Sequence, residues 1–132
     1  SYIVSKQYEK LRDWVDIVTV HSLVNPEVVK KLSGALIVAN MSNYTYDFTF
    51  ESIQLAEECY NNVVGFITQK RINMEGMINM TPGIRTERGR EGDQRYRTVE
   101  EIDTDFIIVG RDLYLGDLSG IEDRVKRILS LS

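Results

Sequence analysis

The sequence predicts an α/β protein built on a parallel β-sheet. Short apolar runs rich in β-branched residues recur along the chain, and several are apolar at consecutive positions rather than alternating. Such runs suit strands that are covered on both faces. Helical patterns separate most of the runs, and this alternation is typical of a parallel sheet. The length of 132 residues predicts one domain, residues 1–132.

Five runs are the predicted strands. They are WVDIVTV (14–20), ALIVANM (35–41), VVGFITQ (63–69), MINMTPG (77–83) and FIIVGR (106–111). Both an open doubly wound sheet and a closed eight-stranded barrel show this alternation. Five strands are too few to close a barrel of the usual kind. The pattern by itself therefore favours an open, flavodoxin-like sheet.

Helices are predicted before, between and after these strands. An opening helix covers residues 6–14, and Asn25-Pro26 starts another, because an N-cap residue is followed by proline at the first helical position. In the next helix, 49–61, the helical spacing gives one apolar stripe, formed by Phe50, Ile53, Ala56 and Tyr60. The last helix follows a capping box and places four apolar residues on one face, namely Ile121, Val125, Ile128 and Leu129.

Composition excludes several classes of function. The formal net charge of -4 argues against binding to nucleic-acid polymers, which requires a basic surface. No apolar run approaches the roughly 18 residues of a membrane span, and no signal peptide is visible, so we expect a cytoplasmic protein. The single cysteine, Cys59, is expected in the core, and one histidine with one cysteine predicts no metal site.

A glycine-rich loop concentrates the positive charge of this acidic chain. The stretch MTPGIRTERGREGDQRYRTVEE (80–101) contains five arginines and only three acids before its helix start. Glycines let the backbone approach a ligand, and guanidinium groups match a phosphate dianion. In a parallel sheet, ligands bind at the carboxyl ends of strands, where this loop begins. The loop is therefore either an anion site or a solvated surface loop whose charges pair among themselves.

Four motifs in register point to a family. GFITQKR, MTPGI, DQRYRTVEEI and DFIIVGRDLY together resemble the C-terminal half of orotidine 5'-phosphate decarboxylase. DIVTVHS and LIVANMS extend the resemblance upstream, so that it spans about residues 6–130. The resemblance implies a partial TIM-type (β/α) barrel of about five parallel strands, the fourth to the eighth, which lacks the N-terminal strands. It also implies that the ligand is an OMP- or UMP-type nucleotide.

The resemblance carries site residues over one by one. Gln94 and Tyr96 match the glutamine and tyrosine of the family's phosphate loop, and Arg111 matches its main phosphate arginine, with Gly110 beside it. The base is expected to contact Ser42, Pro82 and Gln94.

Other positions near these motifs are scaffold residues or departures from the family. His21 matches a histidine of the scaffold. Asp93 and Arg95 stand where the family usually has glycine and glutamine, and Asn40 stands where it commonly has an acid.

The residues that perform the family's chemistry are absent from this chain. A lysine and aspartates in the pattern D-x-K-x-x-D remove the carboxylate in the family, without cofactor or metal, and no such pattern occurs here. The nearest candidate, Lys70, is expected to be a solvated turn lysine. No catalytic residue is therefore assigned, and we expect the chain to be inactive alone.

Two explanations of the missing residues stay open. A complementary N-terminal chain would complete a decarboxylase, and the exposed sheet edges could pair with such a chain or form a homodimer. Alternatively, the chain is a truncated, non-catalytic homologue that binds nucleotides or serves in assembly. A different sugar-phosphate enzyme of the same superfamily is a weaker alternative, because DQRYRT argues against it.

Overall fold

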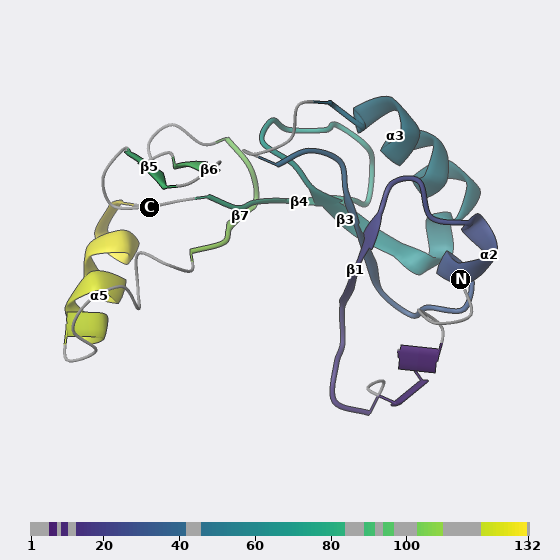
Figure 1. Ribbon diagram of the computed structural model, residues 1–132, viewed down its shortest axis with the longest axis horizontal. Helices are drawn as coiled ribbons and strands as arrows, with labels where there is room; N and C mark the ends of the chain where they lie inside the picture. Colours follow the sequence, from purple (N-terminus) through teal and green to yellow (C-terminus); the bar gives the residue numbers. More distant parts are fainter. Residues whose placement is uncertain are drawn as a thin grey trace.

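The computed structural model describes residues 6–7, 9–10, 13–41, 46–83, 89–91, 94–96, 103–109 and 120–131. Five strands form one sheet in the order β1-β2-β3-β4-β7, and each neighbouring pair is parallel (Figure 1). Their bounds are β1 (Val18–His21), β2 (Ala35–Val38), β3 (Val63–Ile67), β4 (Ile78–Thr81) and β7 (Phe106–Ile107). All five predicted strands are confirmed.

The strand order distinguishes between the two architectures that the sequence left open. Spatial order follows chain order from β1 to β7. Doubly wound sheets reverse their strand order at a switch point, whereas a barrel adds each strand beside the preceding one. The described sheet has no reversal, so the flavodoxin-like expectation is wrong. The sheet instead has the order of a partial barrel.

The strands are shorter than the apolar runs that predicted them. The first run begins at Trp14, but β1 begins at Val18. Trp14 lies in a turn with 86% of its surface exposed, and Ile17 is 43% exposed. An apolar residue can remain in water at the end of a strand, so a run of apolar letters overestimates the strand.

Helix α2 starts where its capping signal predicted. Asn25 caps α2 (Pro26–Val29), because its Oδ1 accepts a hydrogen bond of 3.0 Å from the Glu27 N–H. Helix α3 (Thr49–Glu58) continues into the short 3-10 helix η1 (Tyr60–Asn62). Residues 6, 7, 9 and 10 are helical, in agreement with the opening helix, whereas Asp13 and Trp14 form a turn.

The buried face of α3 differs from the predicted stripe. Phe50 is 68% exposed and Tyr60 is 46% exposed. Ala56 is buried and Ile53 packs against the core, as predicted. The rest of the buried face is formed by Ser52 and Leu55, and Cys59 follows on the same side. The prediction followed the two aromatic rings and was therefore wrong about Phe50 and Tyr60.

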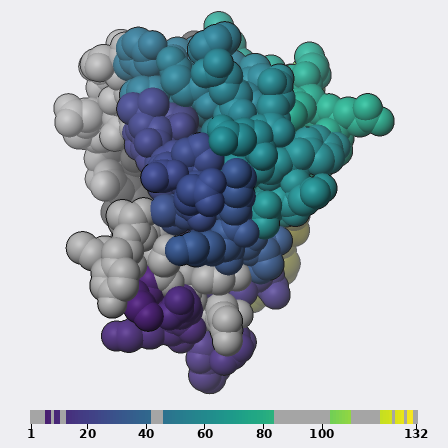
Figure 2. Space-filling model, turned by 90° about the vertical axis from the view of Figure 1, so that its right-hand side faces the viewer, coloured from purple at the N-terminus to yellow at the C-terminus, as the bar shows by residue number. Residues whose placement is uncertain are grey.

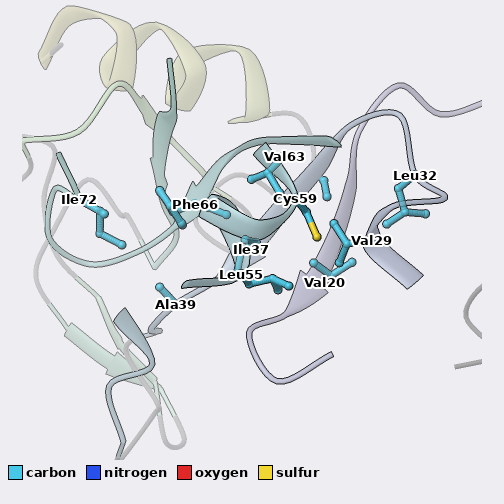
Figure 3. Close-up of a cluster of buried hydrophobic side chains, with 12 residues drawn as sticks. Val20, Val29, Leu32, Ile37, Ala39, Leu55, Cys59, Val63, Phe66 and Ile72 are labelled. Carbon is cyan, nitrogen blue, oxygen red and sulfur yellow. The ribbon is translucent and has the colours of Figure 1, made fainter. Parts of the chain in front are cut away.

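The core lies between α2, α3 and one face of the sheet (Figure 3). Val29 and Leu55 bring the helices against Ile37 and Phe66 of the strands. In β2, Leu36 is 4% exposed although it does not belong to this cluster, so both faces of β2 are buried, as its consecutive apolar residues predicted. Cys59 is 2% exposed, and burial raises the pKa of its thiol, which agrees with a core cysteine.

Figure 2 shows that the segment from β1 to β2, in purple and blue, packs directly beside α3 and the residues after it, in teal.

The two ends of the described chain lie outside the core. Helix α5 (Ile121–Leu131) lies away from α2 and α3 (Figure 1). Of its predicted apolar face, Val125 is 36% exposed and Leu129 is 68% exposed.

A small hairpin follows β4 in the chain. Strands β5 (Gly89–Glu91) and β6 (Gln94–Tyr96) are antiparallel, with Gly89 opposite Tyr96 and Glu91 opposite Gln94. The hairpin is separate from the five-stranded sheet. The glycine-rich loop thus contains regular backbone structure at the segment that matches the family's phosphate loop.

Candidate functional site

The carboxyl ends of the parallel strands share one edge of the sheet. This edge is where open or closed α/β folds place their ligands. Polar residues follow the strands here: Asn40 comes two residues after β2, and Thr68 and Gln69 come directly after β3. Thr81 is the last residue of β4. The edge therefore carries side chains that can position a polar ligand.

Asn40 connects three segments at this edge. Its Nδ2 lies 3.3 Å from Asp47 Oδ1, 3.3 Å from Thr49 Oγ1 and 3.2 Å from Thr68 Oγ1. Its Oδ1 accepts a hydrogen bond from the Gln69 backbone N–H. A carboxylate oxygen only accepts and a backbone N–H only donates, so these two partners fix the orientation of the amide. Asn40 thus joins the end of β2, the end of β3 and the start of α3.

Asp47 is the charged member of this network. Its Oδ1 also accepts hydrogen bonds from the Thr49 backbone N–H at 2.9 Å and from the Thr49 hydroxyl. The Thr49 hydroxyl is the largest cause that lowers the carboxyl pKa below its ordinary value, and the Thr49 N–H, Asn40 and the charge of Lys70 also lower it. The exposed carboxylate is therefore held in its ionised form close to the strand ends.

A row of hydroxyl groups continues the network across β4. Thr68 Oγ1 donates to the Lys70 carbonyl at 2.6 Å. Thr81 Oγ1 donates to the Thr68 carbonyl at 2.8 Å and lies 2.8 Å from Thr104 Oγ1. Thr68 and Thr81 are fully buried. Because each hydroxyl has a partner, the row stabilises the edge rather than offering reactive groups.

Pro82 is the one predicted site residue whose surroundings are fully described. It is buried directly after β4, and its carbonyl lies 3.4 Å from Gln69 Nε2. Gly83 follows with φ of 76°, a conformation that favours glycine. Pro82 therefore belongs to the same polar edge as Asn40 and Gln69.

The other predicted site residues are described only in part. Gln94 and Tyr96 are the first and last residues of β6. Three of the predicted site residues lie outside the described residues, namely Ser42, Gly110 and Arg111. Asp93 and the arginines at 85, 88 and 97 also lie outside them. The structure thus brings together Pro82 and the Asn40 network, and it does not relate the phosphate residues to them.

His21 has a structural environment. Its Nδ1 accepts a hydrogen bond of 3.1 Å from the Leu23 backbone N–H, which requires an unprotonated Nδ1. Its ring packs edge-on against Phe48, with centroids 5.0 Å apart. These contacts tie the end of β1 to the start of α3, and they support the scaffold role expected for His21.

The sequence prediction did not identify Asp47, Thr68 and Thr81 as members of the site. One signal could have found two of them, because Thr68 and Thr81 are polar residues at the ends of apolar runs, in FITQ and NMTP. Asp47 had no such signal. It lies seven residues after Asn40, and only the folded chain brings the two side chains together.

The described residues provide neither a metal site nor a membrane-spanning helix. No group of three or more histidine, cysteine, aspartate or glutamate side chains there is arranged to hold a metal ion. No helix in the described part of the chain is long and apolar enough to cross a membrane.

Comparison with known proteins identifies the family. The family model for orotidine 5'-phosphate decarboxylase / HUMPS matches residues 1–117. Orotidine 5'-phosphate decarboxylase of Phycomyces blakesleeanus is 32% identical over 148 aligned residues, which cover 94% of this chain and 55% of that protein. The enzyme of the same name from Schizophyllum commune is 30% identical over 147 residues, covering 90% of this chain and 53% of that protein.

A longer protein shows a similar level of identity. Uridine 5'-monophosphate synthase of Bos taurus is 34% identical over 132 aligned residues, covering 83% of this chain and 28% of that protein. The chain thus spans about half the length of the two fungal decarboxylases and a smaller share of the bovine protein. The family match agrees with the parallel sheet and its strand order, and this chain belongs to the orotidine 5'-phosphate decarboxylase / HUMPS family.

Proposed function

We propose that this chain is the phosphate- and pyrimidine-binding part of an orotidine 5'-phosphate decarboxylase, the enzyme that converts OMP to UMP and CO2. The observation that carries the proposal is the family match, which includes both segments expected to bind phosphate, 94–96 and 110–111. The hairpin of β5 and β6, which contains the first segment, follows the carboxyl end of β4 in the chain. This is the side of the sheet on which barrels bind their ligands.

The proposed ligand contacts divide into two sets. Gln94, Tyr96, Gly110 and Arg111 bind the phosphate. Tyrosine and glutamine donate single hydrogen bonds, a glycine backbone allows close approach, and the guanidinium of Arg111 forms a forked, charge-assisted pair with the dianion. Ser42, Pro82 and Gln94 contact the base. Pro82 supports this assignment through its buried position at the polar edge.

The catalytic groups are proposed to come from outside this chain. Decarboxylation in the family uses a lysine and aspartates in the pattern D-x-K-x-x-D, without cofactor or metal, and this pattern is absent from the sequence. A complementary N-terminal chain would supply it. We expect such an assembly to act in the cytoplasm.

A second candidate function is that of a non-catalytic binding or assembly protein. The observation that favours it is the open sheet: among the described strands, β1 pairs only with β2 and β7 pairs only with β4. Unpaired strand edges invite pairing with another chain, including a second copy. Mass spectrometry of the native protein distinguishes the candidates, because a co-purifying chain with D-x-K-x-x-D supports the enzyme.

Calorimetric titration with UMP tests the nucleotide site. We expect UMP to bind, and Arg111→Ala to weaken binding by about 10²-fold, because the variant loses the charge-assisted pair with the phosphate. Arg85→Ala is the matched control, since Arg85 is another arginine of the glycine-rich loop 80–101 but has no assigned contact with the nucleotide. No binding at millimolar UMP, or equal losses in both variants, would reject the phosphate site and favour the assembly role.

A further inference from the structure

We propose that Asn40 is a positioning residue that holds the segment between β2 and α3 in place for nucleotide binding. This inference rests on the proposed function, because that segment contains Ser42, a proposed base contact. Asn40 and Asp47 lie at the two ends of this segment. The Asn40 side chain joins these ends, because its amide donates to the Asp47 carboxylate.

The backbone closes the two ends of the segment against the sheet. The Phe48 N–H donates to the Ala39 carbonyl at 2.9 Å, and the Ala39 N–H donates to the Ile67 carbonyl at 2.9 Å. The segment therefore leaves β2 and returns beside the point of departure. These backbone bonds fix the positions of the two ends of the segment.

The Asn40 side chain adds a second set of bonds at the same place. Its amide group donates toward Asp47, which precedes α3, and toward Thr49, the first residue of α3, and it accepts from the Gln69 N–H after β3. The half-buried amide at the end of β2 thus bonds to the start of α3 and to the neighbouring strand end at once. Removal of the amide leaves the Gln69 N–H without this acceptor and Asp47 without this donor.

The neighbouring charges explain why an amide suits this position. Asp47 is the acidic partner of Asn40, and the charge of Lys70, which follows β3, acts on it. Tyr46 precedes Asp47 in the chain, and its hydroxyl donates to Glu51 of α3 at 3.2 Å. A carboxylate at position 40 could still accept from Gln69, but it would face the Asp47 carboxylate without a proton between them. An amide provides one acceptor and one donor in the required directions.

The first test uses the protein without nucleotide. We expect Asn40→Ala to increase the amide hydrogen-exchange rates of Gln69 and Thr49 by about tenfold. The Gln69 N–H loses its acceptor, and Asp47, which accepts from the Thr49 N–H, loses a donor that holds it in place. Asn62→Ala is the matched control, because Asn62 is also half-buried and donates to backbone carbonyls, at 2.8 Å to Leu32 and 3.3 Å to Lys30. It precedes β3, at the opposite end of the strands.

The second test measures UMP affinity in the folded variants. We expect Asn40→Ala and Asn40→Asp each to weaken UMP binding by about tenfold. The exchanged pair Asn40→Asp with Asp47→Asn should recover most of this loss, because one donor again faces one acceptor. Asn62→Ala should lower stability but leave the affinity of the folded protein unchanged.

The outcomes separate this inference from the proposed function. If the unmodified protein binds UMP and Asn40→Ala binds it equally well, the inference is overturned while the nucleotide site stands. If Asn62→Ala and Asn40→Ala change exchange and affinity alike, Asn40 has only a general stabilising role and the inference is overturned. If the unmodified protein does not bind UMP, the proposed function fails, and the positioning role for a nucleotide falls with it.

Discussion

Asp105 joins two strands through both its backbone and its side chain. Its Oδ2 accepts a hydrogen bond of 2.7 Å from the Asn79 N–H, and its own N–H donates to the Asn79 carbonyl at 3.1 Å. Arg71 Nη1 lies 3.2 Å from its other oxygen. The Asn79 N–H is the main cause that holds the pKa of this carboxyl below its ordinary value, followed by Arg71. One residue thus extends the pairing of β4 with β7 beyond the ladder.

This lowered pKa predicts acid sensitivity. A group whose pKa is lower in the folded state stabilises the protein above its unfolded value, about 3.9 for aspartate, and this contribution is lost as the pH falls through the folded value. We expect Asp105→Asn to lower stability at pH 7 and to reduce the difference between the urea midpoints at pH 7 and pH 3. Unchanged pH dependence in the variant would show that the carboxylate contributes nothing measurable.

At the scale of elements, Gly65 allows β3 and β4 to approach closely. It is paired with Ile78 across the two strands. A Cβ atom at position 65 would overlap the Ile78 carbonyl oxygen and lie 2.7 Å from its Cγ1. Glycine inside a strand usually marks such a close approach of another backbone. The β3–β4 contact therefore depends on the absence of a side chain.

Replacing this glycine tests that contact. We expect Gly65→Ala to destabilise the protein by about 3 kcal/mol, the upper range for overpacking, because the obstructing atom belongs to backbone. Val64→Ala is the control, since it changes the neighbouring strand residue without adding atoms and should cost less. Chemical denaturation of both variants measures the difference. A neutral Gly65→Ala would mean that the strands can separate locally without loss.

Helix α3 offers a prediction of the opposite sign. Ser52 is fully buried, and its hydroxyl has no hydrogen-bond partner among the residues that the structure describes. Alanine removes this unpaired group and has a higher helix propensity. We expect Ser52→Ala to raise the free energy of unfolding by about 1 kcal/mol. Destabilisation by the same change, measured by urea titration, would indicate that the hydroxyl has a partner.

The sequence predicted elements better than it predicted their faces. Strand β2 could be found because Ala35, Leu36 and Ile37 are consecutive and apolar, and burial on both faces requires this pattern. The full buried face of α3 could not be found, because Ser52 makes that face less apolar, whereas Phe50 makes the exposed side more apolar. The spacing of apolar residues detects only an apolar face, whereas small polar side chains such as serine can also be buried in a packed core.

The candidate site was predictable only where residues carry a local signal. The resemblance of MTPGI named Pro82 as a base contact, and this role stays a prediction, although Pro82 is buried at the polar edge. The bond between Asn40 and Gln69 joins residues 29 positions apart, so no local pattern contains it. Strand order had the same limitation, because the pattern of runs fits both a doubly wound sheet and a barrel until the neighbours of each strand are known.

For the whole molecule, we expect this chain to bind the nucleotide and another chain to supply the catalytic groups. The chain matches about half the length of the fungal decarboxylases, and its sequence lacks D-x-K-x-x-D. We expect the purified 132-residue protein to release no CO2 from OMP, because no lysine is assigned to protonate the pyrimidine. A radiometric assay with carboxyl-labelled OMP measures this directly. Sustained release of labelled CO2 would contradict the assignment of the catalytic groups to another chain.

The central claim is that this chain recognises a nucleotide through its phosphate. Calorimetric titration of the unmodified protein with UMP and, separately, with uridine tests it most directly, since the two ligands share the base and ribose. We expect UMP to bind at least about 10²-fold more tightly than uridine, because charge-assisted contacts to the phosphate dianion are made only with UMP. Equal affinities for the two ligands, or no binding of UMP at millimolar concentration, would contradict it.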